Sequence, residues 1–455
     1  MGDTYVMGFD LGTTSVKVCL INKITGQIED IQWQETNSQI STKSTSQNVK
    51  TIFKAIEECC GRLCVDKLDG VNAIAVCGQM HGCVFWKQTD VWNDLNSSIE
   101  DVEVSSLYTW MDDRCHPDFL SDLPSPHSHL KLSTGFGCCT IFWFLKNRPE
   151  FLAKFNRCAT IQDLFVAYLC RLSVPVVCDQ NAASWGYFDT ISNTWNVERL
   201  KECDFPVNLL PIVVKPNTEV GITKTNWLNL PTSCKVYVAL GDFQCSVFAV
   251  MESEYDAVLN ISTSAQLTFL KPKGFLPSIP VPKNQMIDYF PFFDNRYLAV
   301  AASLNGGNVL ASFVKMLHQW TTFLGAEISE ANIWKKLSES KTEVESSMVV
   351  DPTIFGERYK PEKRASISNI GFSSLQLNEV YYCICKGLIS NLQSFISAAT
   401  LQENGIQRIL GSGNAFLKNA ILQQEIRRQY NVPVVCCAGK DAAIGAALSI
   451  VKNRN

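Results

Sequence analysis

Apolar runs in the first half of the chain alternate with helical patterns and short polar loops. Apolar sequence flanks a small polar loop between residues 5–11 and 15–20, which predicts two strands joined by a tight turn. Residues 47–64 carry apolar side chains at helical spacing, and residues 71–77 then form a buried strand pattern that ends at Gly78. This alternation predicts an α/β domain, in which ligands bind at the carboxyl ends of strands.

The second half of the chain repeats the opening pattern. Residues 258–268 again read as an apolar strand, a turn of small hydroxyl residues and a second apolar strand. Such an internal echo indicates two related units. We therefore expect an N-terminal lobe over residues 1–245 and a C-terminal lobe over residues 246–455, closing on a nucleotide in the cleft between them.

Other segments complete the expected alternation. The pattern predicts helices over 140–146, 160–172, 309–317, 377–401, 417–429 and 441–451, strands over 107–110, 236–240, 298–304, 407–410 and 432–435, and a polar turn over 179–185.

Composition and charge narrow the class of protein. At 46% hydrophobic and 18% charged residues, the 455-residue chain is typical of a globular protein that is neither disordered nor membrane-embedded. Its net charge of −4 argues against nucleic acid as the main partner. The first residues show no secretory signal pattern, which leads us to expect a cytosolic protein.

The 19 cysteines and five histidines do not suggest a disulfide framework or a metal cluster. Many cysteines, such as Cys19 and Cys77, lie inside apolar runs, where they act as small buried hydrophobes. The adjacent pairs lack the spacing typical of zinc ligands.

The opening turn is a candidate phosphate site. Gly12 allows close approach of the backbone to a ligand, and Thr13, Thr14 and Ser15 offer hydroxyl and amide donors. Asp10 could hold Mg²⁺ through water at the end of the strand, and Lys17 adds a cation. Taken alone, the stretch is equally explained as an ordinary hairpin turn.

Two later loops carry groups suited to a sugar. Gln79 and His81 stand between two glycines and could bond hydroxyls, although an exposed polar turn explains them as well. Trp110 precedes Asp112 and Arg114, so an aromatic ring lies beside groups that bond hydroxyls. A solvated charge cluster is the alternative for this second loop.

The remaining strand ends offer what phosphoryl transfer needs. Neither a P-loop nor a Rossmann glycine pattern is present. Phosphoryl transfer requires held phosphates, offset charge and an aligned acceptor hydroxyl. We assign phosphate contacts to Thr263 with the opening turn, and the general base to Asp242, whose other interpretation is a helix cap. The nucleotide platform is assigned to the glycine turns at Gly306, Gly307 and Gly413.

Taken together, these stretches resemble the FGGY family of carbohydrate kinases over essentially the whole chain. The resemblance lies in residues 10–17, 78–82, 110–114, 241–242 and Thr263. It implies two ribonuclease-H-like lobes of the actin and hexokinase type, the cofactors ATP and Mg²⁺, and transfer of a γ-phosphate to a terminal hydroxyl of a ketose. Residues 134–143, 179–188 and 301–310 resemble the members that phosphorylate sedoheptulose, giving the 7-phosphate used in the non-oxidative pentose phosphate pathway.

The resemblance also implies residue roles. Asp242 would be the base and Asp10 the magnesium-side carboxylate; His81, Asp112 and Arg114 would border the sugar, and Gly411 to Asn414 the adenine. The chain departs from the family at Thr140, Ser412, Asn414 and Asp441. Phe243 after the base is apolar, so hydroxyl recognition would pass to Gln244 or Asn181. A xylulose kinase and a non-catalytic sugar- or nucleotide-binding regulator on the same fold are the competing hypotheses.

Overall fold

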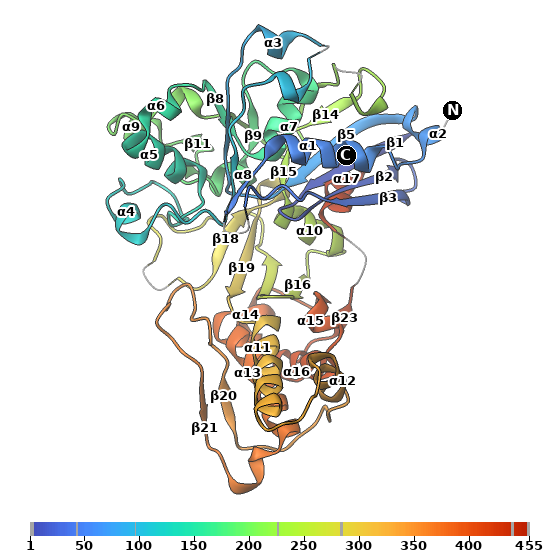
Figure 1. The fold of residues 1–455 in the computed structure, drawn as a ribbon, viewed down its shortest axis with the longest axis vertical. Coiled ribbons are helices and arrows are strands. Elements are labelled where there is room, and N and C mark those ends of the chain that lie inside the picture. The colour runs from blue at the N-terminus through green and yellow to red at the C-terminus, as the bar shows by residue number, and fades with distance from the viewer. Residues whose placement is uncertain are drawn as a thin grey trace.

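The protein consists of two lobes, one above the other, each built on a mixed β-sheet (Figure 1). The computed structural model describes residues 4–41, 44–95, 97–224, 227–282, 285–437 and 441–452. The extreme N-terminus, on which the expectation of a cytosolic protein rests, lies partly outside these ranges. No helix within them is long and apolar enough to cross a membrane.

The sheet of the upper lobe combines an antiparallel meander with parallel strands. β1 pairs antiparallel with β2, and β2 pairs antiparallel with β3. On its other side β1 pairs parallel with β5, which continues to β14 and β15. These strands are β1 (Tyr5–Leu11), β2 (Ser15–Asn22), β3 (Ile28–Glu35), β5 (Val71–Gly78), β14 (Lys235–Tyr237) and β15 (Leu240–Gly241), with β13 (Glu219–Ile222) at one edge. The parallel strands bring the ends of β1, β5 and β15 to one side of the sheet.

The sheet of the lower lobe repeats this arrangement. β16 pairs antiparallel with β17, β17 pairs antiparallel with β19, and β16 pairs parallel with β22. These strands are β16 (Asp256–Ile261), β17 (Ala265–Leu270), β19 (Tyr297–Ser303) and β22 (Arg408–Ser412), flanked by β18 (Asp288–Pro291) and β23 (Val434–Cys436). The echo in the sequence thus corresponds to two sheets of the same strand order, and the turns after β1 and β16 occupy equivalent positions.

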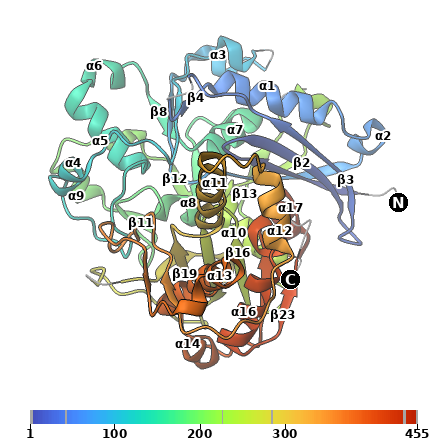
Figure 2. The ribbon, with the colours of Figure 1, turned by 60° about the horizontal axis from the view of Figure 1, so that its bottom comes forward.

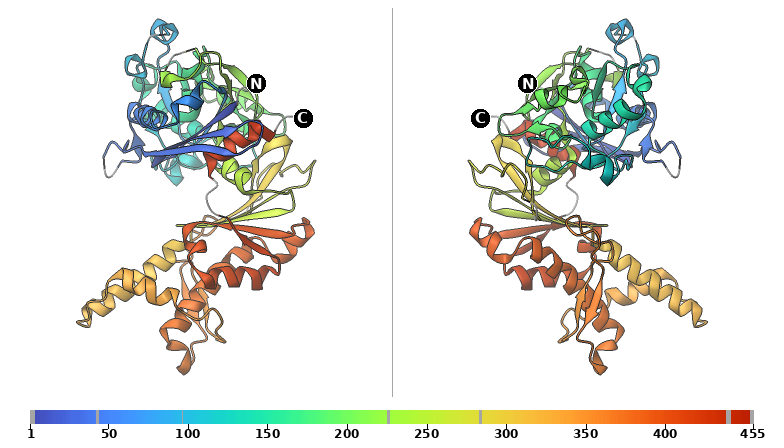
Figure 3. Two further views of the ribbon diagram at one scale, coloured as in Figure 1. Left: turned by 90° about the vertical axis from the view of Figure 1, so that its right-hand side faces the viewer. Right: turned by 90° about the vertical axis from the view of Figure 1, so that its left-hand side faces the viewer.

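Helices cover both faces of the upper sheet. α1 (Val49–Cys60) and α7 (Ile161–Cys170) lie on one face, where Phe9, Phe53 and Phe165 pack edge to face. α10 (Asp242–Val250) and α17 (Ala442–Lys452) lie on the other. α17 ends the described chain yet packs in the upper lobe, beside α10 and β1 (Figure 3). The division at residue 245 stays a proposal. α17 is an exception to it, because this helix belongs to the second half of the sequence but packs in the upper lobe.

Several predicted elements differ from the structure for local reasons. The polar turn expected over 179–185 is wrong, because it contains the helix α8 (Asp179–Ala183). The single helix expected over 377–401 is two, α13 (Leu377–Phe395) and α14 (Ala398–Glu403), because extended backbone at Ile396 ends the first and Ser397 caps the second. Asn419 similarly caps α16 (Ala420–Tyr430), which follows the short α15 (Asn414–Leu417).

The remaining elements lie around these two sheets. In Figure 2 helices of the lower lobe, among them α11, α13 and α16, come forward below the upper sheet. The other elements are β4 (Ser46–Gln47), α2 (Val65–Leu68), β6 (Val84–Trp86), α3 (Asp90–Asn93), β7 (Leu107–Tyr108), α4 (Pro117–Ser121), α5 (Gly137–Asn147), α6 (Pro149–Leu152), β8 (Arg157–Ala159), β9 (Val176–Cys178), β10 (Phe188–Asp189), β11 (Thr194–Trp195), α9 (Val197–Lys201), β12 (Ile212–Val214), α11 (Gly307–Phe323), α12 (Glu330–Ser338), β20 (Val349–Asp351) and β21 (Ser366–Ser368), with short 3₁₀ turns between them.

Candidate active site

The turn between β1 and β2 is held in shape by side chains from other segments. The Gly12 amide donates to the Ser15 carbonyl at 3.1 Å, which closes the hairpin. The Thr13 carbonyl accepts from Gln47 Nε2 at 2.6 Å, and the Thr13 hydroxyl accepts from Trp110 Nε1 at 3.0 Å. Thr14, by contrast, is exposed. The predicted phosphate turn is therefore a braced loop that still presents an open edge.

Asp10 lies at the end of β1 within a group of charged side chains. Burial raises the pKa of its carboxyl to about 8; Asp242 and Asp441 raise it too, whereas Lys17 lowers it. Lys17 Nζ pairs with Asp441 Oδ2 at 3.2 Å. Lys17, expected to add a cation at the phosphate turn, thus links the first sheet to the residue before α17.

Asp242 stands at the first position of α10, beside the end of β15. The N-cap is Gly241, so the prediction of Asp242 as the cap is wrong. The Phe243 amide donates to Asp242 Oδ1 at 2.7 Å. Burial nevertheless raises the pKa of this carboxyl to about 6. The amides of Phe243 and of Asp242 itself oppose this rise in pKa.

The chemistry of this corner suits a hard cation bound through water. Asp10 Oδ1 is buried and has no hydrogen-bond partner among the described residues. No group of three His, Cys, Asp or Glu side chains that could hold a metal directly occurs within those residues. Mg²⁺ commonly keeps several waters and binds through one or two carboxylates and phosphate oxygens, which fits Asp10 and Asp242.

His81 lies on the candidate sugar side as a neutral imidazole. It has a positive φ of 74° and stacks on Phe136 at 4.9 Å between ring centroids. Burial lowers its pKa to about 4. Because the Ser184 carbonyl lies 3.0 Å from Nδ1 and can only accept, Nδ1 carries the proton and Nε2 is an acceptor. His81 can therefore accept a hydrogen bond from a hydroxyl group.

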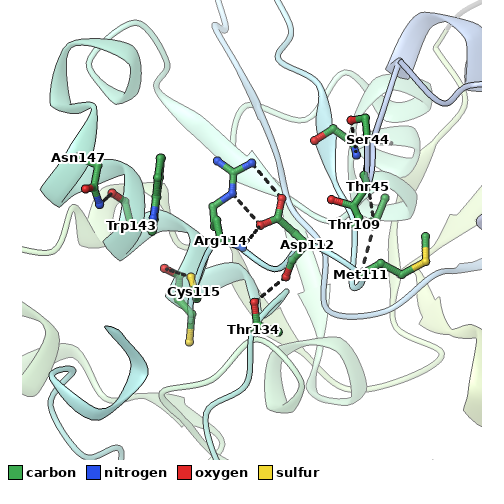
Figure 4. A network of polar contacts seen from close by, with 12 residues as sticks. Ser44, Thr45, Thr109, Met111, Asp112, Arg114, Cys115, Thr134, Trp143 and Asn147 are labelled. Atoms are coloured by element: carbon green, nitrogen blue, oxygen red, sulfur yellow. Dashed lines mark hydrogen bonds and ion pairs between the residues drawn. The ribbon is translucent and has the colours of Figure 1, made fainter. Parts of the chain in front are cut away.

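Asp112 and Arg114 form a buried ion pair (Figure 4). Arg114 Nε and Nη2 donate to the two carboxylate oxygens at 2.7 and 2.9 Å. The guanidinium lies over the rings of Tyr108 and Phe144, and Thr134 donates to the Asp112 carbonyl. Asp112 is only 2% exposed, so a solvated charge cluster is the wrong interpretation. The two side chains thus satisfy each other's hydrogen-bonding groups, and the pair stabilises the loop that carries Trp110.

Asn181 and Gln244 lie next to the candidate base but below the surface. Both are fully buried. Asn181 lies on α8, and Gln244 Nε2 donates to the Pro291 carbonyl of β18 at 3.2 Å. Asn181 Oδ1 and Gln244 Oε1 are buried without a partner among the described side chains and backbone. Asp179 Oδ1, also on α8, is a third buried oxygen without a partner among the described residues.

The second hairpin turn packs tightly against the predicted nucleotide platform. Thr263 is exposed on the turn between β16 and β17, and its carbonyl accepts from the Asn308 amide at the start of α11. A Cβ on Gly307 would lie 2.3 Å from the Ser262 carbonyl. Gly413 has a φ of +91°, and a Cβ there would lie 2.4 Å from the Ile261 carbonyl. These glycines let three chain segments meet at the turn.

The other two predicted glycines serve the same packing. A Cβ on Gly306 would lie 2.5 Å from the Ser264 carbonyl carbon, and one on Gly411 would lie 2.1 Å from the Phe416 ring. The Gly306 and Gly307 amides donate to Asn308 Oδ1 and the Ser262 carbonyl. The Gly306 and Gly307 amides are therefore used within the protein and are not free donors.

Two cavities flank this platform and share Ser262 and Asn414. One, of about 540 Å³, is lined by Lys17 and Asp441 from the upper lobe and by Gln266 from the lower. The other, of about 990 Å³, lies between α11, α12 and the start of α16, with Trp334 and Tyr381 in its wall. A charged cavity that shares lining residues with a larger, more apolar one suits a phosphate chain attached to a flat base.

The structure adds residues that the sequence did not suggest. Asp441 faces Asp10 and Lys17, and Gln47 braces the opening turn. Asp441 stands at a strand end, between β23 and α17, whereas Gln47 ends the short strand β4, where no site was expected. The sequence indicated Asp441 only as a departure from the family pattern, because its contact with Lys17 depends on the packing of α17 against the first sheet.

Comparisons with known proteins agree with this geometry. A model of the FGGY family of carbohydrate kinases, N-terminal domain, matches residues 5–249. Sedoheptulokinase from Homo sapiens is 42% identical over 98% of this chain and 97% of that protein, and the Mus musculus protein is equally similar. Xylulose kinase from Escherichia coli is 24% identical over 59% of this chain and 55% of its own length.

Solved structures show the same architecture. Xylulose kinase from Rhodospirillum rubrum superimposes with a TM-score of 0.81 at 16% identity, covering 99% of this chain and 90% of that one. Gluconate kinase from Lactobacillus acidophilus has a TM-score of 0.77 at 19% identity, covering 100% and 91%. The predicted fold class, two lobes of the actin and hexokinase type, is confirmed.

Proposed function

Because this chain belongs to the FGGY family of carbohydrate kinases and is thus an ATP-dependent sugar kinase, we propose that its substrate is sedoheptulose. The proposal rests on one observation, the 42% identity to two sedoheptulokinases over nearly the whole chain. The xylulose kinases match only about half of the chain, at 24% identity or less. The product would be sedoheptulose 7-phosphate, used in the non-oxidative pentose phosphate pathway of the cytoplasm.

Asp242 would act as the general base. Its Oδ2 would take the proton of the terminal sugar hydroxyl as that oxygen attacks the γ-phosphorus of ATP. The Phe243 amide holds Oδ1 and so fixes the direction in which the carboxylate faces. A pKa of about 6 leaves the carboxylate ionised at neutral pH yet more basic than an exposed aspartate.

The nucleotide would lie along the two cavities beside the platform. Its base would occupy the larger cavity, and its phosphates would extend past Ser262 toward Lys17 and the opening turn. Mg²⁺, held through water by Asp10 and Asp242, would offset the charge of the transferred phosphoryl group. His81 Nε2 would accept a hydrogen bond from the sugar, and Trp110 would cover its carbon-bound hydrogens.

A substrate panel tests this proposal. Phosphate transfer from ATP to sedoheptulose, D-xylulose, glycerol and ribulose is measured in parallel as kcat/KM. We expect sedoheptulose to give the highest value; a higher value for xylulose would replace the substrate assignment. Binding of sugar and ATP without any transfer would favour a regulator instead, against which the presence of both Asp10 and Asp242 argues.

A further inference from the structure

A closed ring of hydrogen bonds joins the phosphate turn to the sugar-side loop. Gln47 Nε2 donates to the Thr13 carbonyl at 2.6 Å, and Gln79 Nε2 donates to Gln47 Oε1 at 2.9 Å. The Thr13 hydroxyl donates to Gln79 Oε1 at 3.4 Å and accepts from Trp110 Nε1 at 3.0 Å. Gln47 and Gln79 are each 2% exposed. The two glutamines therefore lie inside the protein and Thr13 is half-buried, so the ring lies between the two predicted binding regions.

The Thr13 carbonyl oxygen fixes the direction of every hydrogen bond in the ring. A backbone carbonyl can only accept, so Gln47 must turn its NH₂ group to the Thr13 carbonyl and its Oε1 to Gln79. Gln79 must then give its own NH₂ group to Gln47 and its Oε1 to the Thr13 hydroxyl. The single Thr13 hydroxyl proton is consequently committed to Gln79 and is not available to a phosphate oxygen.

This arrangement conflicts with phosphate binding at Thr13. A phosphate oxygen needs a donor, so the Thr13 hydroxyl can bind it only by rotating away from Gln79. The bond that must break is the longest in the ring, at 3.4 Å. Gln79 Oε1 would then be a buried acceptor without a partner, a costly state. A hydroxyl of the sugar would relieve it.

We propose that the Thr13–Gln79 hydrogen bond couples the binding of the two substrates, and that Gln47 is the positioning residue that makes this coupling possible. Nucleotide binding turns the Thr13 hydroxyl toward phosphate and frees Gln79 Oε1 to accept from the sugar. Gln47 Oε1 accepts from Gln79 Nε2 and so prevents a flip of the Gln79 side-chain amide. This inference rests on the proposed sugar kinase activity and adds a binding order to it.

Calorimetric titration measures the coupling directly. Sedoheptulose and D-xylulose are each titrated into the protein with and without a non-hydrolysable ATP analogue and Mg²⁺. We expect the analogue to tighten binding of the preferred sugar by roughly 5- to 150-fold, and that sugar to tighten binding of the analogue by the same factor. If xylulose binds and sedoheptulose does not, the proposed substrate is overturned, and the coupling is then measured with xylulose. Binding of neither sugar would overturn both proposals.

Three variants and one control separate this relay from coupling by movement of the lobes. In Thr13→Val, Gln79 Oε1 is free at all times, so the sugar should bind without nucleotide nearly as tightly as it binds the wild type with analogue. Thr13→Ser keeps the hydroxyl and should keep the coupling. Gln47→Leu should lose the coupling and bind the sugar more weakly. The control, Gln32→Leu, removes a side-chain hydrogen bond on the edge strand β3 and should change neither the coupling nor sugar binding. Wild-type coupling in Thr13→Val would overturn the inference.

Discussion

Individual carboxylates in this site are held in a state that costs stability. Burial raises the pKa of Asp10 to about 8 and that of Asp242 to about 6, and the nearby Asp242 and Asp441 raise the pKa of Asp10 as well. At neutral pH the folded chain therefore holds a proton on Asp10 that the unfolded chain would release, whereas Asp242 is mostly ionised and becomes protonated only near pH 6. Selection for stability alone would not favour buried carboxyls with raised pKa values, so their presence supports a functional role.

Replacement of Asp10 should flatten the dependence of stability on pH. The stabilising contribution of a carboxyl with a raised pKa is fully present below its unfolded pKa of about 4, and is lost as pH rises through the folded value of about 8. As the pH rises from 5 to 9, the unfolding free energy of Asp10→Asn should therefore fall less than that of the wild type. We expect the difference to be on the order of 1 kcal/mol or more. Urea unfolding without divalent metal measures this, and equal pH slopes would contradict it.

Asp242→Asn should separate binding from turnover. The amide cannot accept the hydroxyl proton, so kcat should fall by roughly 10²- to 10⁴-fold. ATP affinity, measured by calorimetry, should stay near that of the wild type. Asp66→Asn removes an exposed carboxylate in α2 and should leave kcat unchanged. A wild-type rate in Asp242→Asn would remove this residue from the base role.

The pH profile of the wild type should reflect the same carboxylate. Only the ionised form can take a proton, and its pKa is about 6. With Mg²⁺ saturating, kcat/KM for the sugar should therefore be level above pH 7 and fall roughly tenfold per unit well below pH 6. A rate that stays level down to pH 5 would mean that no carboxylate with a raised pKa controls the proton transfer.

At the scale of elements, the sequence predicted the repeated hairpins well because their signal is local. Residues 5–20 and 258–268 form the expected strands and turns. The helix breaks near Ile396 and Asn419 were missed because apolar periodicity continues across them while a serine or asparagine cap ends the pattern. Contacts between distant segments, such as Asp441 with Lys17, leave no pattern in the local sequence.

The contact between α10 and α17 gives a test at this scale. A Cβ on Gly445 would lie 1.9 Å from the Cys245 carbonyl oxygen, so Gly445→Ala must push the two helices apart. We expect a loss of about 1–3 kcal/mol in unfolding free energy, with a lower kcat because Asp242 begins α10. Gly61→Ala, with its nearest neighbour at 3.4 Å, should change neither. Wild-type stability and rate in Gly445→Ala would contradict this packing.

At the scale of the whole molecule, the two lobes are tied together on one side and face a cavity on the other. Tyr297 donates to the Thr190 hydroxyl at 2.9 Å, and His129 Nε2 lies 2.6 Å from the Tyr289 carbonyl. These bonds join β18 and β19 to the upper lobe. Lys17 and Ser262, near the two hairpin turns, instead line the cavity of about 540 Å³. We therefore expect movement of one lobe against the other to hinge on the tied side.

Closure about that hinge should accompany binding of both substrates. Water in the site would compete with the sugar hydroxyl for the phosphoryl group, so a kinase of this shape gains from excluding it. Small-angle scattering with sedoheptulose and a non-hydrolysable ATP analogue should give a smaller radius of gyration than the ligand-free protein. Thr13→Val should still contract, because its defect lies in the relay and not in the hinge. Identical scattering curves with and without both ligands would contradict a large closure and place the exclusion of water in local loop movements instead.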